Sequence, residues 1–257
     1  MHRYNQARID SLETRAVPQK GVSVSGKIQS RLYTAPERSD YRHLSLEHES
    51  DVEKAFLIQL DFQLVIDRLW TQKIFPIDGG YAVDIVIQLS PFSMEPPPII
   101  CLEVKEFHDL KENFDKYLIS YRRKAAWFAD QGLRFRLLTD RCFNAHYLRN
   151  ATNYRVFISD YVNDEEGEFL NEVFMRSPAI SRTGILEYAD RSGAGMPLAN
   201  RAVDKAIAQR EILVDLEAPI GDHTLLRDIT SRESWKHPYA DDPFIRKIAA
   251  GSFPEFN

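Results

Sequence analysis

The sequence predicts an α/β fold: a mixed β-sheet flanked by helices, followed by a smaller domain of helices and a β-hairpin. Between residues 50 and 140, segments of helical periodicity and short apolar runs follow one another in the order helix, strand, strand, strand, helix, strand. After about residue 158, three short amphipathic segments precede a hairpin pattern. We therefore expect one domain over residues 1–158, with a polar lead-in over 1–40, and a second over 159–257.

The composition is that of an ordinary globular protein. Of the 257 residues, 44% are hydrophobic and 28% are charged, and no run approaches the roughly 20 apolar residues of a membrane span. The N-terminus lacks the apolar core of a secretory signal, and the two cysteines, Cys101 and Cys142, form no metal-type pair. We expect a cytoplasmic protein with no membrane partner. The formal net charge of −5 means that contacts with nucleic acid would depend on local basic patches or on a bound cation.

The first helix is predicted to begin at Ser50. Ser50 and Glu53 form the S-x-x-E pattern of a capping box, and apolar residues then recur at helical spacing. These residues are Val52, Phe56, Leu57 and Leu60. Upstream of the helix, GVSVSGKIQSRLYT is the segment most typical of a strand.

Three strands and a long helix follow. The segments WTQKIFPI, YAVDIVIQL and IICLEVK have the pattern of strands, and turn residues 78–80 and a proline-rich loop separate them. This order predicts an antiparallel meander. A helix from about Asp109 to Asp130 and a strand in LRFRLLTD complete the mixed sheet.

The second half of the chain predicts a winged-helix arrangement. Helices are expected in NDEEGEFLNEVFM, SRTGILEYAD and PLANRAVDKAIAQREI, and a hairpin is expected around Pro219–Asp222. Arg201, Lys205 and Arg210 lie on the third of these helices, where a recognition helix would contact DNA, but neighbouring acidic residues dilute this signal. We therefore expect this domain to contact protein, and the irregular tail from Trp235 to act as a docking segment.

Three acidic residues and a lysine are candidates for chemistry. Asp84 lies in the middle of an apolar strand, Glu103 and Lys105 share one face of another, and Glu53 borders the buried stripe of the first helix. If the two strands pair, the carboxylates of Asp84 and Glu103 repel each other unless they are protonated or bridged by a divalent cation. Oxygen ligands of this kind suit Mg²⁺ or Mn²⁺ and not zinc. Lys105 could then orient a water molecule or offset charge on a phosphate, so metal-assisted hydrolysis of a phosphodiester is the expected reaction class.

Each of these residues also has a purely structural interpretation. Glu53 could simply complete the capping box begun by Ser50. Asp84 could be a buried acid held by a backbone donor or by an arginine, and Glu103 with Lys105 could form a cross-strand ion pair.

Basic residues on and after the long helix could line a DNA-facing edge. They are Arg122, Arg123, Lys124, Arg134 and Arg136. A cluster of charges on a helix is also typical of a solvated face, so both interpretations stay open.

The set formed by Glu53, Asp84 and the Glu103-Val104-Lys105 triplet resembles the motif of the PD-(D/E)xK nuclease superfamily, with Val83 in the place of the namesake proline. More closely, residues from about 30 to 143 are similar to TnsA, the endonuclease subunit of heteromeric cut-and-paste transposases. The matching stretches are QSRLYT, HESDVEKAFLIQLDF, TQKIFPI, AVDIVI, CLEVKEF and the helix that leads through WFADQGLRFRLLTD. The second half is similar to the winged-helix domain of that family in pattern only.

The resemblance implies a restriction-endonuclease-like sheet and a specific set of roles. Glu53, Asp84 and Glu103 would hold one or two Mg²⁺ ions, for which Mn²⁺ substitutes, with the backbone carbonyl of Val104 as a further ligand and Lys105 as the catalytic lysine. The subunit would cleave the 5′ strands of double-stranded DNA at transposon ends, while a separate DDE-type transposase cuts the 3′ strands. An AAA+ regulator would bind the C-terminal region, and the complex would work at the bacterial nucleoid.

Two other functions fit the same residues. One is a stand-alone nuclease of a defence or restriction system from the same superfamily. The other is a non-catalytic DNA-binding scaffold on a nuclease-like fold, although such proteins usually lose one of the acids or the lysine.

Overall fold

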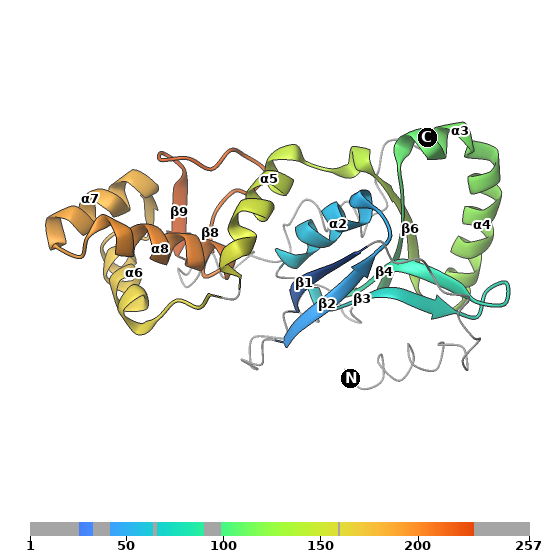
Figure 1. Ribbon diagram of the computed structural model, residues 1–257, viewed down its shortest axis with the longest axis horizontal. Coiled ribbons are helices and arrows are strands. Elements are labelled where there is room, and N and C mark those ends of the chain that lie inside the picture. The colour runs from blue at the N-terminus through green and yellow to red at the C-terminus, as the bar shows by residue number, and fades with distance from the viewer. Residues whose placement is uncertain (1–25, 33–41, 64–65, 90–98, 159, 229–257) are drawn as a thin grey trace. The chain divides into compact units, whose positions relative to one another are not determined.

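The computed structural model describes residues 26–32, 42–63, 66–89, 99–158 and 160–228 (Figure 1). The chain divides into two compact units, and the second unit begins at Phe143. This boundary precedes the one predicted after residue 158, because a helix that the sequence pattern did not predict, α5 (Ala145–Tyr154), belongs to the second unit. The lead-in before residue 26, the proline-rich loop and the tail from Trp235 lie outside the described residues.

The first unit contains a four-stranded mixed sheet in the order β3-β4-β5-β6. Its strands are β3 (Ile66–Phe75), β4 (Tyr81–Leu89), β5 (Ile99–Lys105) and β6 (Arg134–Thr139). β3, β4 and β5 are antiparallel neighbours, whereas β6 runs parallel to β5. The predicted meander and the mixed α/β sheet are thus confirmed. A separate two-stranded antiparallel sheet pairs β1 (Gly26–Leu32), which lies in the predicted upstream strand segment, with β2 (Arg42–His48), which was not predicted.

The first predicted helix of the first unit is observed, whereas the second predicted helix is divided in two. Helix α2 (Asp51–Asp61) begins after its predicted N-cap, Ser50, whose side chain accepts a hydrogen bond from the Glu53 N–H. The prediction of a single helix from Asp109 to Asp130 is wrong, because the segment forms two helices separated at Asn113. They are α3 (Phe107–Glu112) and α4 (Phe114–Asp130).

The interruption between α3 and α4 has a local cause. The side-chain amide of Asn113 donates hydrogen bonds to the backbone carbonyl of Asp109 at 3.2 Å and to its carboxylate at 2.9 Å. Asparagine side chains compete in this way with the backbone of a helix, which favours a break. At Asn113 φ is −112°, outside the helical range.

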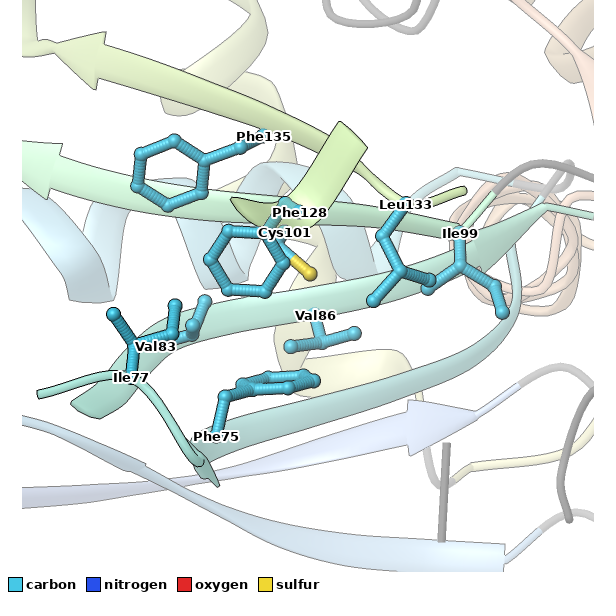
Figure 2. Packing of buried hydrophobic residues seen from close by; sticks show 9 residues of the cluster. All are labelled: Phe75, Ile77, Val83, Val86, Ile99, Cys101, Phe128, Leu133 and Phe135. Atoms are coloured by element: carbon cyan, nitrogen blue, oxygen red, sulfur yellow. The ribbon is translucent and has the colours of Figure 1, made fainter. Parts of the chain in front are cut away.

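Aromatic side chains anchor α4 to the sheet. Phe128 of α4 stacks on Phe135 of β6 at a centroid distance of 4.9 Å and packs edge-on against Phe75 of β3 at 5.0 Å. Figure 2 shows Cys101 in the same cluster, fully buried, which agrees with its expected packing role. Because β4 and β5 are buried almost throughout, any charged group on them needs a compensating partner.

The second unit is built from four described helices and a small sheet. The helices are α5, α6 (Asp164–Arg176), α7 (Arg182–Ser192) and α8 (Met196–Ala208), and the strands are β7 (Ala179–Ser181), β8 (Ile212–Leu213) and β9 (Leu225–Asp228). The three predicted helices and the antiparallel pairing of β8 with β9 are observed, and β7 adds a third strand in the order β7-β9-β8. α8 contacts each of the other three helices, and most of its residues are buried.

None of the helices within the described ranges combines the length and the apolar character that crossing a bilayer requires.

Candidate active site

The two strands that carry the candidate site residues separate at the site. β4 and β5 are paired in antiparallel register up to Ile85 and Leu102. The next residues are Asp84 on β4 and Glu103 on β5, and there the Oδ2 atom of Asp84 accepts a hydrogen bond of 2.7 Å from the backbone N–H of Val104. A carboxylate side chain therefore satisfies a backbone donor just beyond the last paired residues of the two strands.

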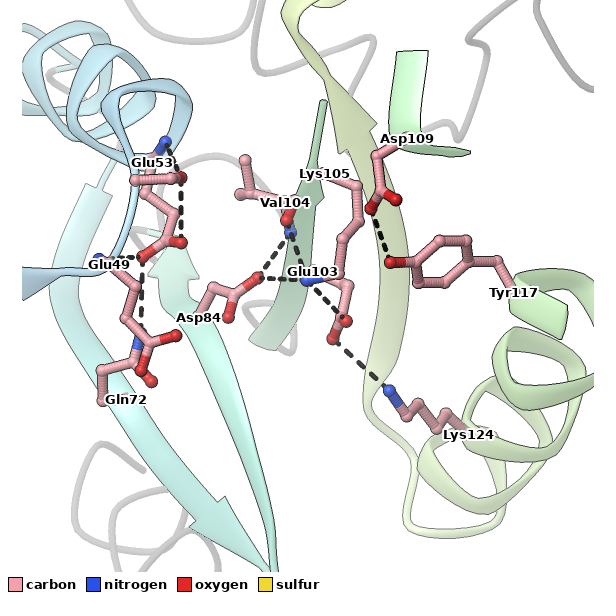
Figure 3. A network of polar contacts seen from close by, with 11 residues as sticks. Glu49, Glu53, Gln72, Asp84, Glu103, Val104, Lys105, Asp109, Tyr117 and Lys124 are labelled. Carbon is pink, nitrogen blue, oxygen red and sulfur yellow. Dashed lines mark hydrogen bonds and ion pairs between the residues drawn. The ribbon is translucent and has the colours of Figure 1, made fainter. Parts of the chain in front are cut away.

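The ammonium group of Lys105 lies between the predicted ligands. Its Nζ atom is 3.0 Å from Oε1 of Glu103 and 3.7 Å from Oδ2 of Asp84. The same ammonium donates a hydrogen bond of 3.0 Å to the backbone carbonyl of Val104. Figure 3 shows these groups side by side. Three groups for which the resemblance implies a metal-binding role thus converge on one cation.

Burial governs the electrostatics of this cluster. Burial raises the pKa of Asp84, and the charge of Lys105 and the hydrogen bond from Val104 lower it only in part. Burial alone would lower the pKa of Lys105, but the charges of Asp84 and Glu103 outweigh it and raise that pKa well above its ordinary value. A buried group of carboxylates with this balance stabilises a nearby cation.

Glu53 lies close to Asp84, but its oxygens are used at the start of α2. Its Oε2 atom accepts a hydrogen bond of 2.8 Å from the Glu49 N–H, and its Oε1 atom accepts one of 3.0 Å from the Ser50 hydroxyl. Burial raises the pKa of Glu53, and the charge of Asp84 raises it further. Glu53 therefore binds the start of its own helix, as the structural interpretation expects, but through the Glu49 N–H and the Ser50 hydroxyl and not through the Ser50 N–H of a capping box. Its charge nevertheless acts on the pKa of the cluster.

The carboxylates of Glu53, Asp84 and Glu103 do not converge on one common position in this structure. Within the described part of the chain, no group of three or more His, Cys, Asp and Glu side chains has the geometry of a metal site. Glu53 points to the start of its own helix, and Lys105 lies between Asp84 and Glu103 (Figure 3). The structure brings Asp84, Glu103 and Lys105 into direct contact and leaves Glu53 beside them.

Two residues near the cluster were not predicted from the sequence. Gln72 of β3 has a φ of 53°, and its side-chain amide donates to Oε2 of Glu53 at 3.4 Å. Glu49 is exposed, yet burial and the charge of Asp84 raise its pKa. The β3–β4 register places Gln72 opposite Asp84, between the pairs Thr71–Ile85 and Lys73–Val83, and the sequence pattern alone did not single it out.

A second lysine reaches the cluster from α4. The Nζ atom of Lys124 is 3.6 Å from Oε2 of Glu103 and 3.7 Å from the centroid of the Tyr81 ring. At 3.6 Å the contact is an ion pair and is longer than a hydrogen bond, so the buried Oε2 atom keeps no hydrogen-bond partner. The sequence pattern predicts Lys124 among the DNA-facing residues, and the structure places its ammonium against Glu103.

The other basic residues of the predicted DNA-facing edge have varied surroundings. Arg122 is exposed, whereas Arg123, also exposed, forms an ion pair with Asp78 in the turn between β3 and β4. Arg134 and Arg136 on β6 are half-buried, and Arg136 donates a hydrogen bond of 2.9 Å to the carbonyl of Phe135.

The basic residues of α8 are bound within the second unit. Lys205 is almost fully buried and lies 3.0 Å from Oε2 of Glu166 and 3.0 Å from Oδ1 of Asp160. Arg201 pairs with the other oxygen of Glu166, and Arg210 follows the helix with a φ of 61°. Arg201 and Lys205 offset carboxylates of the second unit, so these two cations of α8 do not form the free basic face of a DNA recognition helix.

Comparisons with known proteins add no further constraint. No protein-family model matches the chain, and no curated protein matches it either. What the cluster can do is therefore argued from its chemistry: two buried carboxylates, a backbone carbonyl and two ammonium groups, an arrangement that suits a hard cation and a phosphate.

Proposed function

We propose that this chain is a Mg²⁺-dependent DNA endonuclease whose catalytic domain has a restriction-endonuclease-like fold. The observation that carries the proposal is the contact of the Lys105 ammonium with Asp84, Glu103 and the Val104 carbonyl. The oxygen atoms that would bind the metal already surround a positive charge. A merely structural ion pair needs one carboxylate, whereas here two carboxylates from different strands face the same lysine.

The residues of the cluster fit a hard divalent cation. Their donor atoms are all oxygens, as Mg²⁺ and Mn²⁺ prefer. The Oε2 atom of Glu103 is buried without a hydrogen bond, so it has unused capacity to accept a ligand. Asp84, Glu103 and the Val104 carbonyl would hold the ion, and the Glu53 charge would support it. When bound, Mg²⁺ would lower the pKa of a coordinated water and polarise a phosphoryl oxygen.

The protein groups have separate roles in this proposal. Val104 orients the Asp84 carboxylate through its N–H, which leaves Oδ1 directed away from that bond. Lys105 supplies a positive charge where a phosphodiester accumulates negative charge during hydrolysis. β4 and β5 hold these groups on a rigid, buried sheet, which keeps their geometry constant.

We further propose that the chain acts as a TnsA-like subunit that cleaves the 5′ strands of double-stranded DNA at transposon ends. It would work at the bacterial nucleoid with a DDE-type transposase and an AAA+ regulator. The second unit would be a winged-helix-like domain that binds protein. Its internally paired cations on α8 support this role, and acidic residues outnumber basic ones between residues 143 and 228.

The test is a nicking assay on DNA that carries a transposon end, with Mg²⁺ and with the DDE-type transposase and AAA+ ATPase that the proposal expects in neighbouring genes. The expected result is a nick at the 5′ strand that Asp84→Ala abolishes. If Asp84→Ala nicks as well as the wild type, the chain is a non-catalytic scaffold. If neighbouring genes encode a defence system and cleavage needs no partner, the stand-alone nuclease is the correct function.

A further inference from the structure

Lys124 is held at the cluster by two independent contacts. Its ammonium lies 3.7 Å above the Tyr81 ring and 3.6 Å from Glu103, and its side chain is only 15% exposed. Figure 3 shows it approaching Glu103 from α4, on the side opposite Asp84. A lysine that serves only to keep a helix soluble extends into water. This one is folded inward, at the cost of losing part of its hydration.

The ion pair leaves the Oε2 atom of Glu103 incompletely satisfied. The distance of 3.6 Å exceeds that of a hydrogen bond, and Oε2 of Glu103 is buried without a hydrogen-bond partner. Lys124 therefore balances charge at Glu103 without engaging the carboxylate closely. An anion with freely placed oxygens, such as a phosphate, could accept hydrogen bonds from the same ammonium.

The charges of the cluster are nearly balanced before any ion binds. Asp84 and Glu103 lie beside the ammonium group of Lys105, Glu103 also pairs with Lys124, and the charge of Lys124 also acts on Asp84. Glu53 adds its charge from beside Asp84. Three carboxylates against two ammonium groups leave little net negative charge to attract a divalent cation. Glu49 adds a fourth carboxylate, but it is exposed and water screens it.

We propose that Lys124, through its charge at Glu103, weakens the affinity of the cluster for a divalent cation until a DNA phosphate is present. This inference depends on the proposed nuclease function and adds a regulatory step to it. Without DNA, Lys124 balances Glu103 and repels a second cation. A bound phosphate pairs with Lys124 and removes that repulsion, so the metal and the DNA bind cooperatively.

The experiment measures Mn²⁺ affinity of the full chain by electron paramagnetic resonance, with and without a duplex oligonucleotide. Lys124→Met removes the charge and keeps the length of the side chain. Without DNA we expect this variant to bind Mn²⁺ roughly tenfold more tightly than the wild type. The repulsion between the Lys124 ammonium and an Mn²⁺ ion about 6 Å away, screened as in water, has this size. With DNA the difference shrinks. A general loss of packing would weaken Mn²⁺ binding, so tighter binding separates the charge role from a structural role.

Two further variants serve as controls. Lys116→Met removes an exposed lysine from the same helix and should leave the Mn²⁺ affinity unchanged. Lys124→Gln repeats the test with a polar side chain in case the methionine variant folds poorly. Unchanged or weaker Mn²⁺ binding by both Lys124 variants overturns the inference and leaves the proposed function standing. A difference that DNA does not reduce overturns the role of the phosphate. Failure of the wild type to bind Mn²⁺ with or without DNA overturns both proposals.

Discussion

The carboxylate of Asp84 on β4 accepts a 2.7 Å hydrogen bond from the backbone N–H of Val104 on β5. The bond joins the two strands just beyond their last paired residues, Ile85 and Leu102. Asp84 therefore has a structural role and a proposed catalytic role, and substitutions can separate the two.

Asp84→Asn and Asp84→Ala should differ in stability and agree in activity. Asparagine keeps an oxygen that accepts the Val104 N–H, and it removes a charge that burial already disfavours. We expect its free energy of unfolding to stay within about 1 kcal/mol of the wild type. Alanine leaves that N–H unsatisfied, which costs about 1–3 kcal/mol. Urea denaturation measures both values, and both variants should lose nicking. An asparagine variant that nicks normally would show that the carboxylate charge is not needed.

Lys105→Met should lose strand cleavage without losing the fold. The ammonium contacts Glu103 and Asp84, and positive charge at a developing phosphate charge is worth about 10²–10³ in rate. We expect a fall of that size in the rate of single-turnover nicking, with duplex binding in filter assays reduced far less. Lys111→Met, on the exposed surface of α3, is the matched control. A rate within threefold of the wild type would remove Lys105 from the proposed mechanism.

Glu53 offers a test between its capping role and its proposed metal role. Glu53→Ala removes the acceptor for the Glu49 N–H and the Ser50 hydroxyl, and loss of such a cap costs about 0.5–2 kcal/mol. Glu53→Gln keeps one acceptor oxygen and should be milder. If Glu53 supports the metal, the glutamine variant loses nicking although its thermal unfolding is nearly normal. Nicking that falls only in proportion to stability would leave the cap as its sole role.

The sequence predicted the part of the site that depends on strand alternation. Glu103 and Lys105 are two apart on an apolar strand and Asp84 interrupts another, so their meeting follows once the strands pair. Lys124 could not be assigned in this way, because its direction depends on how Phe128 seats α4 against Phe135. The stacking of Phe128 on Phe135 is a tertiary contact, and the periodicity of the sequence does not predict it.

The differences between the predicted and the observed helices also have local causes. The break between α3 and α4 arises from the Asn113 side chain, which binds Asp109 within an otherwise helical pattern. Helix α5 was not predicted, although Asn144 caps it by accepting from the N–H groups of His146 and Tyr147. Tyr147, Ala151 and Tyr154 form a buried stripe at helical spacing, so the sequence contained both the cap and the periodic pattern, and the prediction missed them.

Glu166 and Lys205 make the stability of the second unit depend on pH. Burial acts to raise the pKa of Glu166, but hydrogen bonds from the Asn163 N–H, Arg201 and Lys205 outweigh it and lower the pKa. The stability that Glu166 contributes is therefore complete above its ordinary pKa of 4.5 and is lost as the pH falls through the folded-state value. Burial acts to lower the pKa of Lys205, but Glu166 and Asp160 raise it above 10.5. The contribution of Lys205 is complete below pH 10.5 and is lost as the pH rises further.

Glu166→Gln should reduce the stability of the unit at neutral pH and flatten its loss in acid. Removing the carboxylate leaves the buried ammonium of Lys205 with Asp160, which is half exposed, as its remaining ion-pair partner. We expect a cost of roughly 3 kcal/mol, at the low end for a broken buried pair because solvent reaches part of the network. Urea unfolding between pH 3 and pH 7 measures the effect. Glu168→Gln, at an exposed position of α6, is the control and should change neither the stability nor its slope with pH. An equal effect of both variants would contradict the buried network as its source.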